Sequence, residues 1–196
     1  MTAETWPNLV TMFFDQAAEK RDAPFLWAKT DGTYHDFSWS QAASIIEALA
    51  HGLKAAGVNP GDRVVLISEN RPEWLMADMA IMAAGGISVP AYTTNTTADH
   101  VHILSDSGAV GVIVSNDRLA KSLIPAAEQV ESAKFIVGID ALSDTGTGTL
   151  QSHTWASMTD SNDKEGTIKE EAQSLKRTDT ACIIYTSGTG GAPKGV

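Results

Sequence analysis

The chain has little of several things, and each shortage argues against a class of protein. Its one cysteine, Cys182, cannot form an internal disulfide or a cysteine-based zinc site, which fits a reducing compartment. Lysine and arginine number 14 against 24 for aspartate and glutamate, which gives a formal net charge of -10. Because an acidic surface repels nucleic acid and anionic membrane surfaces, the composition argues against both as partners.

Long hydrophobic runs are also missing. A bilayer span needs ~20 apolar residues, and the longest candidate, residues 74–84, is short and contains Asp78. The first 22 residues lack the basic start and the apolar stretch of a signal peptide. We therefore expect a cytoplasmic protein without a transmembrane segment.

What is present is an ordinary globular composition, with 43% hydrophobic and 19% charged residues, which predicts a packed core. In the N-terminal part, Asn8 is placed to cap a helix, and two short strands flank a turn at Asp31–Gly32. Ser38 or Ser40 then begins a second helix with a clear apolar stripe.

Between residues 62 and 140, apolar runs alternate with helical patterns. One of these helices is expected to begin at Thr96 or Thr97. The predicted strands are Val64–Ile67, Ile87–Ala91, Val110–Val114 and Phe135–Ile139. Strands that are apolar on both faces are typical of a parallel sheet covered by helices. The β-α-β-α-β-α-β pattern therefore predicts an α/β fold with a doubly wound parallel sheet flanked by helices.

We divide the chain into four segments. Residues 1–61 are expected to pack N-terminal helices and short strands on the core, and residues 62–140 hold the βαβ repeats. Residues 141–177 are rich in Ser, Thr, Gly and Asp and predict a surface connection with short helices near residues 155 and 168–175. Residues 178–196 are expected to hold a strand, residues 181–185, with Cys182 in the core, followed by a loop.

That loop carries the chemistry of the chain. It combines hydroxyl side chains, glycines and one lysine behind an apolar strand. Glycines let backbone N–H groups approach an anion closely, hydroxyls add donors, and the lysine supplies a full positive charge. The loop therefore predicts a polyphosphate site, and its candidate binding residues are Thr186, Ser187, Gly188, Thr189, Gly190, Gly191 and Lys194.

Other known motifs do not fit the loop. A standard P-loop requires glycine and Ser/Thr on either side of its lysine, but here Pro193 and Gly195 occupy those positions. Neither a G-x-G-x-x-G nor a G-x-S-x-G pattern can be found in it. His100 and His102 lie two apart on a predicted helix and so face different directions, and we predict no metal site. No residue of the chain is assigned as catalytic.

The loop resembles the signature loop of the adenylate-forming superfamily, which includes acyl-CoA synthetases, firefly luciferases and peptide-synthetase adenylation domains. The family pattern is T-S-G-[ST]-[ST]-G-x-P-K-G, and the chain departs from it only at Gly190, where the family has Thr or Ser. Further segments look like the branch of long-chain fatty acyl-CoA synthetases: Gly61–Val64, Ser68–Trp74, Ala83–Gly86 and Val89–Tyr92.

The resemblance implies an AMP-forming acid–thiol ligase. Such enzymes convert a carboxylate and ATP into acyl-AMP and pyrophosphate, and coenzyme A then displaces AMP. The loop would hold the β- and γ-phosphates, magnesium would share their charge, and the partners would be a fatty acid, ATP and coenzyme A. The remaining machinery of the family lies past the position of Val196. We therefore expect an incomplete N-terminal part of the adenylate-forming fold, inactive by itself.

Several alternatives stay open. The residues that choose the acid also lie past Val196 in the family, so an aromatic acid or an amino acid is an alternative substrate. A truncated, non-catalytic binding module is a further alternative. Acyl chain length is not determined, and the resemblance leaves both a homo-oligomer and association with a membrane open.

Overall fold

The computed structural model describes residues 6–160, 167–186 and 191–196. Its central sheet is built from β3 (Arg63–Ile67), β4 (Ile87–Pro90), β5 (Gly111–Val114), β6 (Phe135–Gly138) and β7 (Gln151–Thr154). All neighbouring pairs are parallel, and the order across the sheet is β4-β3-β5-β6-β7. The chain thus moves from β3 to one side and then crosses back to the other, as in a doubly wound fold. The predicted fold class is confirmed.

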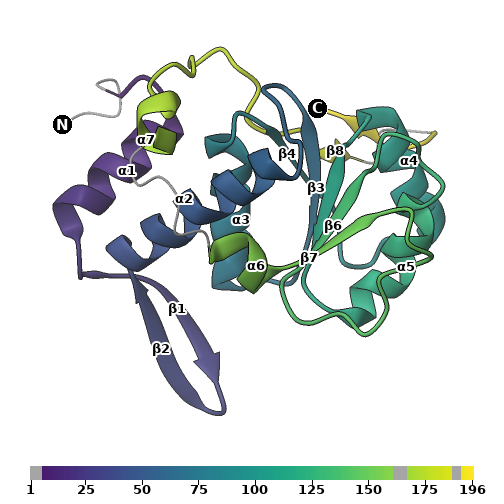
Figure 1. The fold of residues 1–196 in the computed structure, drawn as a ribbon, viewed down its shortest axis with the longest axis horizontal. Helices are drawn as coiled ribbons and strands as arrows, with labels where there is room; N and C mark the ends of the chain where they lie inside the picture. Colours follow the sequence, from purple (N-terminus) through teal and green to yellow (C-terminus); the bar gives the residue numbers. More distant parts are fainter. Residues whose placement is uncertain (1–5, 161–166, 187–190) are drawn as a thin grey trace.

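Helices cover both faces of this sheet (Figure 1). One face carries α1 (Leu9–Lys20), α2 (Trp39–Ala55), α3 (Pro72–Ala83), α6 (Trp155–Thr159) and α7 (Thr167–Ala172), and the other carries α4 (Thr97–Ser107) and α5 (Asp117–Ala127). Alternate residues of β3 enter the two cores: Val64 and Leu66 pack on the side of α2 and α3, and Val65 and Ile67 pack on the side of α4 and α5. The continuous apolar run of β3 follows from this burial on two sides.

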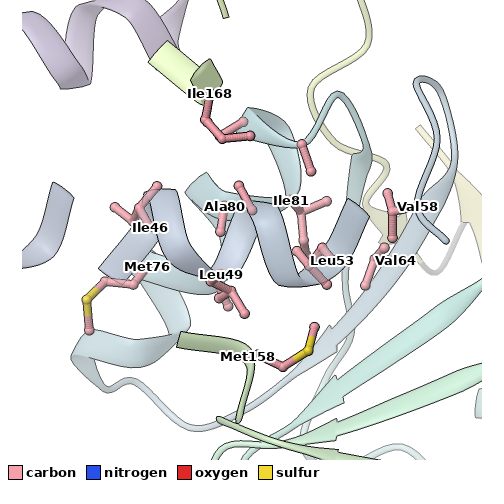
Figure 2. Packing of buried hydrophobic residues seen from close by; sticks show 14 of the residues in the cluster. Ile46, Leu49, Leu53, Val58, Val64, Met76, Ala80, Ile81, Met158 and Ile168 are labelled. Carbon is pink, nitrogen blue, oxygen red and sulfur yellow. The ribbon is translucent and has the colours of Figure 1, made fainter. Parts of the chain in front are cut away.

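The larger core is organised around α2, which lies between α3, α6 and α7 (Figure 2). Its fully buried stripe, Ile46, Leu49 and Leu53, follows the spacing of one helical face. Burying each such side chain stabilises the fold by roughly 1.5–3 kcal/mol. Gly52 allows α6 to approach closely, since a Cβ there would lie 2.8 Å from the carbonyl oxygen of Met158.

The predicted helix starts and the predicted hairpin are found in the structure. The side chains of Asn8, Ser38 and Thr96 each accept a hydrogen bond from a backbone N–H in the first turn of α1, α2 and α4. The strands β1 (Pro24–Thr30) and β2 (Thr33–Ser38) form an antiparallel hairpin that extends away from the sheet (Figure 1). Its turn residues Asp31 and Gly32 both have positive φ, as a two-residue hairpin turn of this hand requires.

One strand of the sheet was not predicted. The strand β7 lies in residues 141–177, where the sequence indicates a surface connection, and it pairs with β6 along one edge of the sheet. Its residues are polar and mostly exposed, so they lack the apolar pattern by which the buried strands are recognised. No helix in residues 6–160, 167–186 or 191–196 is long and apolar enough to cross a bilayer.

A polar network joins the carboxyl ends of β3 and β5. The Glu69 carboxylate accepts hydrogen bonds from the Ser115 hydroxyl at 2.5 Å and from the Asn116 amide at 3.2 Å, and it forms an ion pair with Arg118. Partial burial alone would raise the pKa of the Glu69 carboxyl, but these hydrogen bonds outweigh it and lower the pKa from 4.5 to about 2. The network therefore holds two adjacent loops together through an ionised carboxylate.

We expect Gly111→Ala to destabilise the fold by about 1–3 kcal/mol through overpacking. Gly111 lies opposite Phe135 in the register of β5 and β6, and a Cβ at position 111 would come within 2.4 Å of ring carbons of Phe135. Urea unfolding should show that Gly111→Ala lowers the free energy of unfolding by less in a Phe135→Leu background than in the wild type. Equal costs in the two backgrounds would contradict this explanation.

The Glu69 network should make stability depend on pH. The pKa of the Glu69 carboxyl in the folded protein lies below the ordinary value of 4.5. The network's contribution to the free energy of unfolding is therefore complete above pH 4.5 and is lost as the pH falls toward 2. Urea unfolding should therefore show Glu69→Gln to be less stable than the wild type at pH 6, with the difference shrinking as the pH approaches 3. The exposed Glu131→Gln is the matched control, and a pH-independent effect of Glu69→Gln would contradict the prediction.

Candidate phosphate-binding site

A short antiparallel hairpin joins the two ends of the predicted phosphate loop. Its strands are β8 (Tyr185–Thr186) and β9 (Lys194–Gly195), in which Thr186 is paired with Lys194. The ladder continues outward, because the Ile184 N–H donates to the Val196 carbonyl at 2.9 Å and the Val196 N–H donates back at 3.0 Å. The hairpin therefore fixes where the loop leaves the body of the molecule and where it returns.

The structure describes three of the predicted binding residues. Thr186 and Lys194 are both exposed and lie directly opposite each other across the hairpin. Gly191 is exposed as well, and its φ of 91° is a conformation that favours glycine. The other four predicted residues lie outside the described residues: Ser187, Gly188, Thr189 and Gly190. The phosphate role of all seven stays a prediction.

The strand predicted at residues 181–185 is reduced to a single bridge along the outer edge of β4, and β8 begins only at Tyr185. The Ser88 N–H donates to the Ala181 carbonyl at 3.1 Å, and the Ile183 N–H donates to the Ser88 carbonyl at 2.9 Å, which forms a parallel bridge between Ser88 and Cys182. Exposure alternates along this segment, and Cys182 is exposed while Ile183 is half-buried. The prediction of a buried Cys182 thiol is therefore wrong, because only one face of this edge segment is covered.

The hairpin rests on α4 through two side-chain contacts. The buried Tyr185 donates its phenol O–H to the Asp106 carboxylate at 2.7 Å. The His102 Nε2 lies 2.7 Å from the Pro193 carbonyl oxygen. Burial raises the pKa of the Tyr185 phenol, and the hydrogen bond and charge of Asp106 raise it further. The phenol therefore stays protonated and remains a donor.

Sequence reasoning did not find these contacts. It considered His102 only as a possible metal ligand and predicted no such role, whereas the structure places its ring against the hairpin. The partners are separated by 91 residues for His102 and Pro193 and by 79 residues for Tyr185 and Asp106, so no local spacing could indicate them. By contrast, His100 is buried, and desolvation lowers the pKa of its imidazole.

The described part of the site fits an anionic ligand. It combines the Lys194 ammonium, the Thr186 hydroxyl and a glycine with positive φ, and these are groups that bind phosphate oxygens. In the described ranges no three or more His, Cys, Asp or Glu side chains are grouped to hold a metal ion. The carboxyl ends of β3 and β5, where ligands often bind in open α/β sheets, are instead occupied by the Glu69 network.

Comparison with known proteins identifies sequence relatives of the chain. The chain is 32% identical over 188 residues to the long-chain-fatty-acid–CoA ligase FadD15 of Mycobacterium tuberculosis, in a match that covers 96% of this chain and 30% of the relative. It is 29% identical over 182 residues to the human mitochondrial acyl-coenzyme A synthetase ACSM3, covering 92% of this chain and 29% of that protein. The chain thus spans about 30% of the length of these relatives.

The fold is also found among solved structures. The crystal structure of the anthranilate CoA ligase AuaEII in complex with anthranoyl-AMP superimposes with a TM-score of 0.78 at 20% identity, over 100% of this chain and 36% of that chain. The resemblance to adenylate-forming enzymes that the loop predicts is confirmed by the sequence relatives and by a family profile. The sequence profile described as "AMP-binding enzyme" matches residues 13–196, and the chain belongs to this family of AMP-binding enzymes.

Proposed function

We propose that this chain supplies the ATP phosphate-binding segment of a long-chain fatty acid–CoA ligase. The observation that carries the proposal is the hairpin that pairs Thr186 with Lys194 at the two ends of a glycine-rich loop. The family match and the name of the mycobacterial relative at 32% identity support it. The reaction would join a fatty acid to coenzyme A through an acyl-AMP intermediate, with ATP as the second substrate.

The residues of this chain would bind the β- and γ-phosphates of ATP, which leave as pyrophosphate. In the first step a carboxylate oxygen bonds to the α-phosphorus, and the bond from that phosphorus to the bridging oxygen breaks to release pyrophosphate. Lys194 would balance charge on the β- and γ-phosphates, and Thr186 would donate a hydrogen bond to them. Holding these phosphates places the α-phosphorus for in-line attack. Magnesium bound with ATP would share the phosphate charge.

The second step would require groups that lie elsewhere in the protein. The thiol of coenzyme A bonds to the acyl carbon of acyl-AMP, and the bond from that carbon to the phosphate oxygen breaks to release AMP. Activation of an aromatic or amino acid is the alternative to fatty-acid activation. The name of the mycobacterial relative favours a fatty acid, whereas the anthranilate ligase is similar at only 20% identity. A cytoplasmic location and self-association stay predictions.

We expect Lys194→Ala to slow adenylation by roughly 10²–10³-fold, because one preorganised charged donor to the transferring phosphates is lost. The measurement is fatty-acid-dependent exchange of pyrophosphate into ATP by the full gene product. Lys194 is exposed, so the fold and the unfolding midpoint should not change. The exposed Lys121→Ala on α5 is the matched control, and normal turnover by Lys194→Ala would refute the phosphate role.

The 196-residue chain alone should form no acyl-AMP and should bind ATP only weakly. A single phosphate loop lacks the contacts to the base, the ribose and the acid that most of the binding free energy requires. Incubation of the purified chain with radiolabelled ATP and palmitate, followed by chromatography, tests this. Clear accumulation of acyl-AMP would show that the chain is a complete adenylating unit.

A further inference from the structure

The helix α4 contacts both strands of the hairpin formed by β8 and β9, which we call the phosphate hairpin. His102 contacts Pro193, which directly precedes Lys194, and Asp106 binds Tyr185, which directly precedes Thr186. His102 and Asp106 are four residues apart, so they lie on one face of the helix. Each strand of the hairpin is therefore attached to α4 next to the residue expected to bind phosphate.

The chemistry of each contact determines the direction of its hydrogen bond. The Pro193 carbonyl can only accept, so the His102 Nε2 must carry a proton, which it does in the Nε2–H tautomer and in the imidazolium ion. The Asp106 carboxylate can only accept from the Tyr185 phenol, and a bond to an ionised acceptor is stronger than a neutral one. Each contact therefore has a defined donor and a defined acceptor.

Packing around the tyrosine ring reinforces these bonds. The rings of His102 and Tyr185 meet edge to face, with centroids 5.9 Å apart and an interplanar angle of 84°. On the opposite strand, a Cβ at Gly195 would lie 3.3 Å from Cζ of Tyr185 and 2.7 Å from Cγ2 of Ile183. Gly195 thus lets β9 lie close against the tyrosine that Asp106 holds.

The helix α4 is itself fixed at both ends. A capping box between Thr96 and Asp99 closes its N-terminus, and Gly108, with φ of 61°, ends it. The Arg63 guanidinium, at the start of β3, donates to the Ser107 carbonyl at 2.5 Å and to the Gly108 carbonyl at 2.9 Å. The hairpin is therefore connected, through α4, to the start of β3.

We propose that His102 and Asp106 are positioning residues for ATP, which hold the two strands of the phosphate hairpin on α4 and so place Lys194 and Thr186 against the β- and γ-phosphates. This inference rests on the phosphate role proposed above. Neither residue touches the nucleotide. Their loss leaves the phosphate-binding groups intact but allows the hairpin to move, so the binding of ATP weakens while the binding of the acid does not.

Steady-state kinetics of the full gene product test the proposal. We expect His102→Ala and Asp106→Leu to raise KM for ATP about tenfold. This is a smaller effect than the roughly 10²-fold loss that a ~1 Å displacement of a positioned group can cause. The KM for palmitate should stay unchanged. His102→Gln keeps an N–H donor and Asp106→Asn keeps an oxygen acceptor, so both should restore KM for ATP to near the wild-type value. Ser105→Ala, on an exposed position of α4, is the matched control.

Amide hydrogen exchange on the same preparations gives a readout that does not depend on activity. The N–H groups of Ile184 and Val196 should exchange faster in His102→Ala and Asp106→Leu, and at near wild-type rates in the Gln and Asn variants. Unchanged exchange in the Ala and Leu variants would overturn the proposal, and so would faster exchange with an unchanged KM for ATP. A wild-type protein without ATP-dependent activity would instead overturn the proposed function, and exchange would still decide whether α4 holds the hairpin.

Discussion

The burial of β3 on both faces is the constraint on which the rest of the structure depends. Since helices cover the sheet on two sides, Val64 and Leu66 must be apolar for one core and Val65 and Ile67 for the other. The same strand also organises polar groups at its two ends. Arg63 closes α4 at the start of β3, and Glu69 joins the loops that follow β3 and β5. Residues of this one strand therefore pack against both layers of helices.

The phosphate hairpin is a small element that the sheet supports indirectly. It has only a short ladder of its own, which is marginal in isolation. The edge of β4 guides the chain toward it, and α4 holds both of its strands. A loop rich in glycine needs such support, because glycine loses more conformational entropy than any other residue when it is ordered. The support of the hairpin thus comes from β4 and α4.

Much of this architecture could be predicted from the sequence, because local rules determine it. Continuous apolar runs indicate the buried strands. Asn8, Ser38 and Thr96 indicate helix starts, because their side chains can cap a helix. The strand β7 was missed because an exposed edge strand has no apolar pattern. The contacts of α4 with the hairpin were missed for another reason. They join residues far apart in the chain, and nothing in the local sequence of α4 distinguishes a histidine that binds a carbonyl from one that faces water.

The exposure of Cys182 has a practical consequence. It is the one thiol in the 196-residue sequence, it is exposed, and it lies a few residues before the hairpin on the segment that pairs with β4. A fluorophore attached there by maleimide chemistry would sit beside the phosphate loop without any engineered substitution. The chain thus carries its own attachment point for a reporter beside the proposed phosphate site.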